Sequence, residues 1–366
     1  MLVVWTLHGY PSGTPSLLST LPNPIHSSFA NTRGSLEHIL NSTLGFERIL
    51  AINLPERTDH RDGLVLAAAV SNISIQFVEG THGDSVSAKA LPSYHKDGLH
   101  PGIIGSWRAH MTAVSKVVEE GWATALILED DVDWDIRLKG LLQDFAVSSS
   151  FLLQHGTASQ GEVRMEDMRP FKQPKSSPYG DNWDVLWLGH CGMDVPKDTS
   201  LVRHEDDPTV PEVKHLKSWD ETAISPLKDY PPHTRLVMPQ KQGVCSLAYA
   251  VSQAGARKLL YAVGLQRLEG PFDIMLREFC EGTNNGNAKR NNNDGSNRSN
   301  RCMGVLPQLF DHHRRVGHTN SDSDISPDSG QFRDKAYTYN IRQSVRINMP
   351  RLLEGIVDYI DQWPDS

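Results

Sequence analysis

The chain of 366 residues has no long apolar run and no excess of basic residues. Its 36 Lys and Arg residues are outnumbered by 44 Asp and Glu residues, which gives a formal net charge of −8. Broad binding to nucleic acids or anionic membranes needs a basic surface, and this acidic balance argues against both. No apolar stretch approaches the ~18 residues of a membrane span. We therefore expect a soluble chain without a readable targeting segment.

Hydrophobic residues are also scarce, at 38% of the chain. Three segments account for this low content, because they consist largely of polar residues and bury too little apolar surface to fold. They are residues 1–45, 283–301 and 317–330. We predict that the first is a disordered lead-in and that the second is an Asn-rich insertion.

Cysteines are few, and they lack the paired spacing of a zinc ribbon. The four are Cys191, Cys245, Cys280 and Cys302. Four free thiols and two disulfides formed in a secretory lumen are both compatible with this number. Sequons at Asn41, Asn72 and Asn297 favour the second alternative, although an Asn-rich chain also produces such triplets by chance.

The pattern from residue 46 onward predicts an α/β fold. Residues 48–54 form a short apolar strand stopped by Pro55, residues 64–70 have a helical pattern, and residues 73–78 alternate like a second strand. This succession is typical of a βαβ unit and indicates a parallel sheet.

Two further helices follow from capping residues. Ser106 is the expected N-cap of a helix that ends before Gly121, and Ser252 is the expected N-cap of a helix over 253–263. Long loops are expected over 155–182 and 189–237. The remaining strands are predicted at 125–128, 183–188 and 245–251.

An acidic run directly follows the apolar strand at 125–128. Five carboxylates fall within seven residues, namely Glu129, Asp130, Asp131, Asp133 and Asp135. Ligands of open α/β sheets bind beyond the carboxyl ends of strands. Hard oxygen ligands favour Mg²⁺ or Mn²⁺, which also bridge pyrophosphate oxygens. A solvated acidic turn is the alternative, and the residues alone leave both open.

The run Ile-Leu-Glu-Asp-Asp-Val at 127–132 resembles the LEDD motif of glycosyltransferase family 25, which includes the lipooligosaccharide and collagen galactosyltransferases. Other stretches resemble the family's elements in the same order. They are Ile52-Asn53-Leu54 with Arg57 and Arg61, Gly102 to His110, Ala248 to Ser252, Gly270 to Asp273, and Gln308 to His313. The last stretch is similar to the fungal branch. The chain departs from the family's Leu-Ser-His at Arg108-Ala109-His110.

The resemblance implies a GT-A-like fold over 46–315, which is a Rossmann-like mixed sheet flanked by helices that binds a nucleotide sugar. Residues 316–366 would form a polar linker and a C-terminal tail. The implied activity is metal-dependent, inverting transfer of a hexose, with galactose favoured, from a UDP-sugar to a hydroxyl of a glycan or glycoprotein. Mn²⁺ or Mg²⁺ and UDP-galactose are the expected cofactor and donor. The family also implies the secretory pathway or the Golgi lumen.

The resemblance also implies roles for single residues. Asp131 is the expected metal ligand, Asp133 a second one because the chain spells an Asp-Val-Asp (DXD) motif, and His313 a third. Asp273 is the expected general base that takes the acceptor's proton; its alternative is a helix N-cap. The residues expected to contact the donor are Asn53, Arg57, Arg61, His110, Glu129 and Asp130.

Within this fold, the cysteines are expected to form Cys191–Cys245 and Cys280–Cys302 disulfides, the second of which closes the Asn-rich insertion. A catalytically lapsed relative that binds a glycan or a protein is an alternative function. A different Mg²⁺ enzyme is disfavoured, because neither a nucleophilic Asp-x-Asp start nor a Gly-rich phosphate loop follows the first strand.

Overall fold

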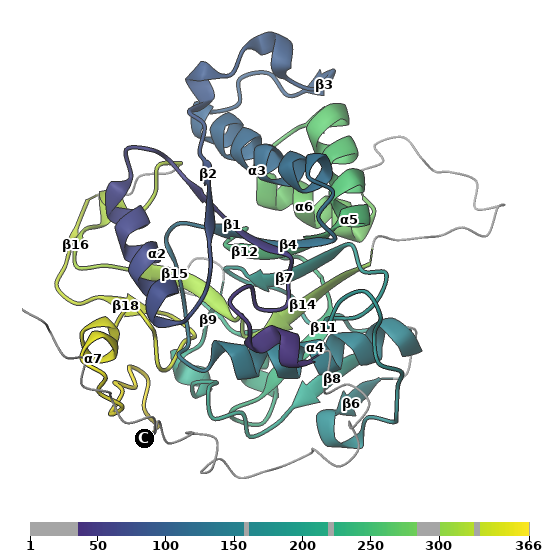
Figure 1. The fold of residues 1–366 in the computed structure, drawn as a ribbon, viewed down its shortest axis with the longest axis vertical. Coiled ribbons are helices and arrows are strands. Elements are labelled where there is room, and N and C mark those ends of the chain that lie inside the picture. The colour runs from purple at the N-terminus through teal and green to yellow at the C-terminus, as the bar shows by residue number, and fades with distance from the viewer. Residues whose placement is uncertain (1–35, 157–160, 219–222, 284–300, 326–329, 366) are drawn as a thin grey trace, which may run out of the picture.

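The computed structural model describes most of the chain. The described residues are 36–156, 161–218, 223–283, 301–325 and 330–365. The predictions for residues 1–35, for most of the Asn-rich insertion and for the Asn297 sequon lie outside them. Within the described residues, a 12-stranded mixed sheet has helices on both faces (Figure 1). The predicted mixed α/β class is therefore confirmed.

Three parallel strands form one side of the sheet, in the order β2 (Gln76–Glu79), β1 (Arg48–Asn53) and β4 (Thr124–Glu129). Helix α2 (Thr58–Val70) connects β1 to β2, and α3 (Pro101–Glu119) precedes β4. The predicted strand–helix–strand unit is confirmed. Because the carboxyl ends of parallel strands meet at one edge, the residues that follow β1, β2 and β4 lie together.

The middle of the sheet brings more segments to the same edge. Strand β12 (Ala248–Ser252) is antiparallel to β4 and to β7 (Val185–Gly189). Residues that precede β12 therefore lie at the edge where β4 and β7 end. The sheet continues through β14 (Cys302–Leu306), β11 (Arg235–Pro239), β8 (Leu201–His204) and β6 (Glu162–Arg164).

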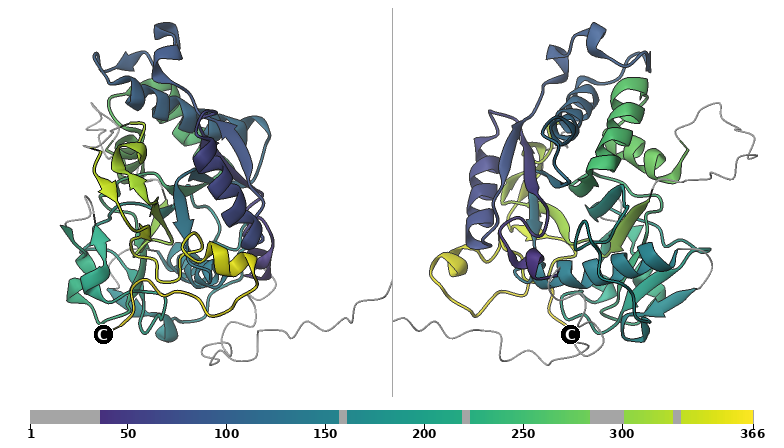
Figure 2. Two further views of the ribbon diagram at one scale, coloured as in Figure 1. Left: turned by 90° about the vertical axis from the view of Figure 1, so that its left-hand side faces the viewer. Right: turned by 45° about the vertical axis from the view of Figure 1, so that its right-hand side comes forward.

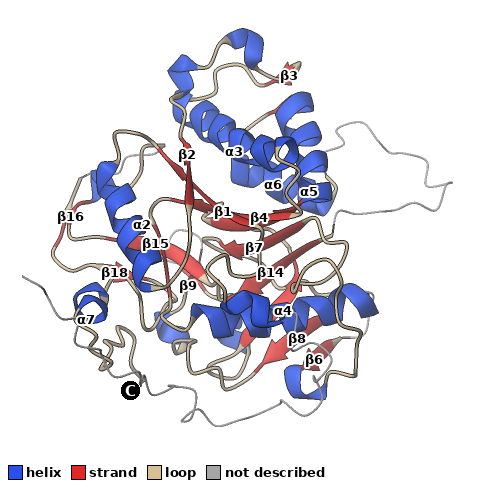
Figure 3. Ribbon diagram, in the orientation of Figure 1, coloured by secondary structure: helices blue, strands red, loops and turns tan. Residues whose placement is uncertain are grey.

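Helices cover both faces of this sheet (Figures 1 and 3). One face carries α3, α5 (Gln253–Leu259) and α6 (Phe272–Glu281), and the other carries α4 (Leu138–His155). Strand β4 alternates between them, since Ala125 and Ile127 belong to the core with α3 while Leu126 and Leu128 belong to the core with α4. Burial on both faces explains the continuous apolar run in the sequence.

Helix α3 begins at Pro101, so the expected N-cap at Ser106 is wrong. The side chain of His100 caps the helix instead, accepting the N–H of Gly102 at Nδ1 over 3.1 Å. Gly105 lies inside the helix. A Cβ at this position would overlap the carbonyl oxygen of Thr81, so a glycine is needed there. The glycines thus permit close packing of the helix on a loop and do not mark a break.

The cap at Ser252 is confirmed, since its Oγ accepts the N–H of Gly255 over 3.0 Å. The helix that follows continues as a π-helix over Leu260–Gln266. The loops expected over 155–182 and 189–237 contain strands β6, β8 and part of β11. These were missed because they are short and charged. Arg235, for example, is buried in β11 against Asp207, with 2.7 Å between Nε and Oδ2.

The described C-terminal residues pack beside the carboxyl edge. Strand β15 (Phe310–Arg314) is antiparallel to β5 (Val132–Trp134) and to β18 (Tyr337–Thr338). Helix α7 (Met349–Leu353) contacts α2, as the two views in Figure 2 show. Three short ladders complete the structure: β3 (Tyr94–His95) with β13 (Arg267–Leu268), β9 (Lys217–Ser218) with β10 (Ala223–Ile224), and β16 (Gly317–His318) with β17 (Phe332–Arg333). No helix among the described residues is long and apolar enough to cross a membrane.

Both predicted disulfides, Cys191–Cys245 and Cys280–Cys302, are present. They fit an oxidising compartment. The second joins the end of α6 to the start of β14, across a sequence separation of 22 residues.

We expect the variant with Cys280→Ser and Cys302→Ser to unfold with a free energy about 3 kcal/mol lower than wild type, because the unfolded chain regains the entropy of an open loop. Denaturant titration followed by circular dichroism measures this difference. An unchanged midpoint and slope would show that the closed loop contributes nothing to stability.

Candidate active site

A cavity of about 740 Å³ opens at the carboxyl edge of β1, β2 and β4. Its lining includes residues 80–84, which follow β2, and the first turns of α3. It also includes Glu129 at the end of β4, the two aspartates that follow it and the start of α6. Residues 322–325 contribute to its lining from the C-terminal part of the chain. The cavity therefore lies where α/β sheets hold ligands.

Glu129, Asp131 and His312 meet on the wall of this cavity. One ligand atom from each residue lies within 4.8 Å of the other two. Oδ2 of Asp131 is 3.5 Å from Nε2 of His312. Oδ1 of Asp131 is buried and has no hydrogen-bond partner among the described residues. Two carboxylates, one of which has an unsatisfied oxygen, and an imidazole suit a divalent cation such as Mn²⁺.

His110 lies behind Glu129 and is only 2% exposed. Its Nε2 is 3.5 Å from Oε1 of Glu129, which also accepts a 2.7 Å hydrogen bond from Oγ of Ser246. The imidazole stacks on Phe272 at a centroid distance of 4.1 Å, and its Nδ1 is 3.1 Å from the hydroxyl of Tyr249. The structure thus brings the predicted donor-binding residues His110 and Glu129 together, with the histidine fixing the carboxylate.

Asn53 and Asp130 also come together. Asn53 lies at the end of β1, is 2% exposed and donates from Nδ2 to Oδ2 of Asp130 over 2.7 Å. The other carboxylate oxygen of Asp130 is 2.9 Å from Nδ1 of His60. The carboxylate of Asp130 is therefore fixed by Asn53 of β1 and by His60 of α2, and it lines the cavity.

The two predicted arginines lie outside the lining of this cavity, as far as the described residues define it. Arg57 forms an ion pair with Asp324 and donates to the carbonyl of Ser321 over 2.9 Å, so it holds the 321–325 segment. The guanidinium of Arg61 lies 4.0 Å from the ring centroid of Phe77. The structure does not bring either arginine to the acidic cluster.

Asp133 and His313, the predicted second and third metal ligands, point away from the cluster. Asp133 is 0% exposed, and its carboxylate accepts hydrogen bonds from Thr338, over 2.7 Å, and from Ser344. Nδ1 of His313 is 3.7 Å from the same carboxylate. Burial opposes the ionised form, but the hydrogen bonds from His313, Ser344 and Thr338 outweigh it and lower the pKa of Asp133.

The alternation of strand β15 explains this outcome. Successive side chains of a strand point to opposite faces, so His312 reaches the cavity while His313 reaches the buried Asp133. The tandem histidines were visible in the sequence, but their pattern does not tell which of the two faces the ligand.

Asp273 lines the cavity from the first turn of α6. Pro271, not Asp273, occupies the N-cap position, and Oδ2 of Asp273 accepts the backbone N–H of Cys245 over 2.7 Å. Burial raises the pKa of Asp273 and the charge of Glu129 raises it further, against lowering by the N–H groups of Cys245 and Ile274. A half-buried carboxylate with a raised pKa has the properties of a general base.

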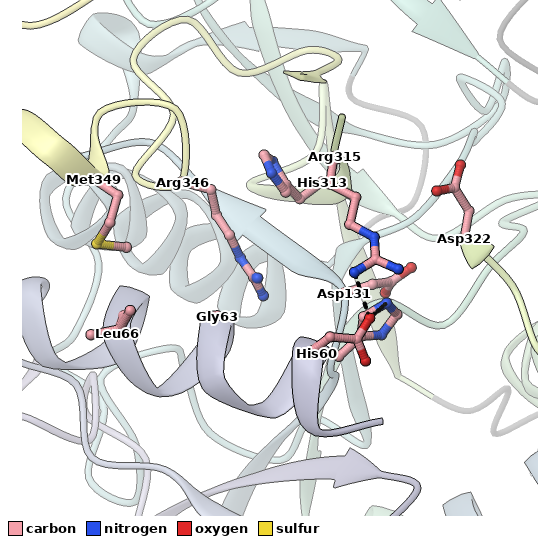
Figure 4. Close-up of a pocket in the computed structure, with 10 residues that line it drawn as sticks. His60, Gly63, Leu66, Asp131, His313, Arg315, Asp322, Arg346 and Met349 are labelled. Carbon is pink, nitrogen blue, oxygen red and sulfur yellow. Dashed lines mark ion pairs between the residues drawn. The ribbon is translucent and has the colours of Figure 1, made fainter. Parts of the chain in front are cut away.

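A smaller cavity of about 230 Å³ also has Asp131 in its lining (Figure 4). Arg346 lines it and was missed by sequence reasoning. It is half-buried and donates to the backbone carbonyls of Asp130, over 3.0 Å, and Val132, over 3.2 Å. Gly63 on α2 leaves room for the guanidinium, since a Cβ there would overlap it. No local pattern links residues more than 200 positions apart.

A mixed sheet with an acidic and histidine cluster at its carboxyl edge is the arrangement of a GT-A-like glycosyltransferase. Curated relatives support this class. Procollagen galactosyltransferase 1 of Danio rerio is 23% identical over 245 residues, which cover 64% of this chain and 31% of the relative. Procollagen galactosyltransferase 2 of Homo sapiens is 26% identical over 245 residues, covering 64% and 29%.

A third relative, inactive glycosyltransferase 25 family member 3 of Homo sapiens, is 25% identical over 247 residues, covering 64% and 32%. No protein-family model matches the chain. The relatives confirm the resemblance to glycosyltransferase family 25 that the motifs indicated. The chain spans about a third of the length of these relatives.

The geometry predicts that Asp133→Asn lowers stability by about 3 kcal/mol, because a buried hydrogen-bonded charge is lost and its donors keep no ionised acceptor. The lowered pKa means that ionised Asp133 stabilises the fold above a pH of about 3.9, and that this contribution is lost as pH falls through the folded-state value. Urea unfolding at several pH values measures both effects.

The same samples separate the structural role of Asp133 from the predicted ligand role. Mn²⁺ affinity, measured by calorimetry on the folded variant, should stay close to the wild-type value. Weakened Mn²⁺ binding with unchanged stability would instead support Asp133 as a ligand.

Proposed function

We propose that the chain is an active, metal-dependent glycosyltransferase that moves a hexose, with galactose favoured, from a UDP-sugar to a hydroxyl of a glycan or glycoprotein with inversion. The observation that carries this proposal is the meeting of Glu129, Asp131 and His312 in the same cavity as Asp273. A cation site and a candidate base in one cavity are the two requirements of an inverting transfer.

In this proposal Glu129, Asp131 and His312 hold the metal, in place of the predicted set with Asp133 and His313. A bound divalent cation would stabilise the negative charge that develops on the departing diphosphate. Ser246 and His110 fix the carboxylate of Glu129 before any ligand arrives. Such preorganisation lowers the cost of binding a highly charged group.

The donor would occupy the part of the cavity between Asp130 and the first turns of α3. We assign Asp130 to the ribose hydroxyls, because Asn53 and His60 fix its carboxylate at the cavity wall. Arg314 lines the cavity beside His312, with 3.4 Å between its Nη2 and Nδ1 of the imidazole. Its positive charge would favour the diphosphate.

Asp273 would accept the proton of the attacking acceptor hydroxyl. Its Oδ2 accepts the N–H of Cys245, which orients the carboxylate within the cavity. The raised pKa of Asp273 makes its carboxylate a stronger base than that of an exposed aspartate.

A lapsed enzyme that binds a glycan or a protein is the second candidate. The observation that favours it is the resemblance to relatives that are named inactive. Binding of Mn²⁺ together with turnover of a nucleotide sugar distinguishes the first candidate from the second.

Thermal unfolding tests the metal set. We expect Mn²⁺ to raise the stability of wild type by about 2.7 kcal/mol at a hundredfold excess over its Kd. The shift should disappear in Asp131→Ala and in His312→Ala, because each removes a ligand atom. His313→Ala is the matched control on the neighbouring position: it should be less stable but keep its Mn²⁺ shift. The reverse outcome for the two histidines would restore the set predicted from sequence.

The variant Asp273→Asn tests the base. The amide preserves an acceptor for the N–H of Cys245 but cannot take a proton, so we expect kcat to fall by about 10² to 10⁴ with little change in UDP-galactose binding. Glu278→Gln, on the same helix, is the control and should keep wild-type kcat. Because the pKa of Asp273 is raised, wild-type kcat should decline in acid at a higher pH than an ordinary aspartate would require. Full turnover by Asp273→Asn would remove it from the mechanism.

A further inference from the structure

The Cys191–Cys245 disulfide is linked to three side chains of the proposed site, either directly or through the next residue. The disulfide partners lie at the carboxyl edge, Cys191 just after β7 and Cys245 just before β12. The N–H of Cys245 donates to Oδ2 of Asp273 over 2.7 Å. Sγ of Cys191 is 3.9 Å from Nδ1 of His312.

The third group is reached through the next residue. Ser246 follows Cys245 and donates from Oγ to Oε1 of Glu129 over 2.7 Å. The backbone conformation at Cys245 therefore sets both the N–H that orients the base and the hydroxyl that orients a cluster carboxylate.

That conformation is unusual. Cys245 has a φ of +62°, in the left-handed region that residues other than glycine rarely adopt. Its carbonyl accepts a 3.0 Å hydrogen bond from the indole of Trp187, and the disulfide fixes its side chain. A strained backbone persists only where its surroundings over-determine it. The disulfide is one of the bonds that hold it.

The two cysteine loops also share backbone hydrogen bonds. The N–H of Cys191 donates to the carbonyl of Val244 over 2.8 Å, and the N–H of Val244 donates to the carbonyl of Gly192 over 3.1 Å. These bonds do not involve sulfur. Opening the disulfide should therefore shift the loops locally without separating them.

The two disulfides differ in access. Cys191 and Cys245 are half-buried, and Cys245 lines the cavity. Cys280 and Cys302 are each only 6% exposed. Thiol–disulfide exchange requires a thiolate to reach a sulfur atom, so the disulfide at the cavity should be reduced first.

We propose that the Cys191–Cys245 disulfide positions Asp273, Glu129 and His312, and that its reduction by a dithiol switches the site off while the fold persists. The loss of turnover rests on the proposed function; the positioning itself does not. In the step, a thiolate of dithiothreitol attacks one sulfur and the S–S bond breaks. The second thiol of the reagent then releases the protein. The cysteines gain two electrons and two protons, and dithiothreitol becomes a cyclic disulfide.

The expected effect is large because the site depends on exact placement. Two thiols cannot remain at bonding distance, so the sulfur atoms must move apart and carry Cys245 with them. A displacement of about 1 Å can cost about a hundredfold in rate. We therefore expect the variant with Cys191→Ser and Cys245→Ser to lose about a hundredfold in kcat and to bind Mn²⁺ about tenfold more weakly.

The matched control is the variant with Cys280→Ser and Cys302→Ser, which removes the other disulfide. It should unfold more easily but keep wild-type kcat and Mn²⁺ affinity. A general loss of stability would lower kcat in both variants alike. A positioning role lowers kcat only in the variant with Cys191→Ser and Cys245→Ser.

Hydrogen exchange gives a readout that does not depend on activity. After mild treatment with dithiothreitol, we expect faster exchange in peptides that contain residues 245–247 and 272–276, with unchanged exchange in α4. If the serine variant does not fold, turnover of folded wild type is followed as the thiols of Cys191 and Cys245 appear.

The outcomes separate the two proposals. If oxidised wild type turns over no nucleotide sugar, the proposed function fails and the exchange experiment alone decides the positioning. Unchanged exchange at residues 245–247, or full kcat after both thiols have appeared, would overturn the inference. Equal loss of kcat in both cysteine variants would also overturn it.

Discussion

Carboxylates repel one another at short range, and five of them fall within seven residues, from Glu129 at the end of β4 to Asp135. At about 4 Å, two such charges cost roughly 4 kcal/mol near a protein surface. The structure separates them by direction. Asp135 turns inward to Arg137, with 2.7 Å between Oδ1 and Nε, and Asp133 is buried among hydroxyl donors. Only Glu129, Asp130 and Asp131 line the cavity, so three of the five carboxylates contribute their negative charge to it.

This separation depends on residues from the other end of the chain. Thr338 and Ser344 supply the hydroxyls for Asp133, and Arg346 covers the carbonyls of Asp130 and Val132. The residues from Thr338 to Arg346 therefore support the site through these hydrogen bonds. Within the described part of the chain, no residue after 325 lines the larger cavity. We propose that the folded domain includes this segment.

Local patterns were sufficient for the elements that have them. The apolar run of β4, the acidic residues after it and the cap at Ser252 were all predictable, because each is determined by neighbours in the sequence. The beginning of α3 was not predictable, because Gly105 is required by its close contact with Thr81 and does not mark the beginning of the helix. The choice between adjacent histidines on β15 depends on which face of the strand meets β5, which becomes fixed only in the folded sheet.

The Cys280–Cys302 disulfide has a consequence for how the chain tolerates change. It holds the Cα atoms on either side of the Asn-rich insertion 5.6 Å apart, within the core that α6 and β14 share. Any sequence that spans this short gap satisfies the flanking elements equally well. The length and composition of the insertion can therefore change without disturbing the sheet, and a foreign segment could be accommodated there.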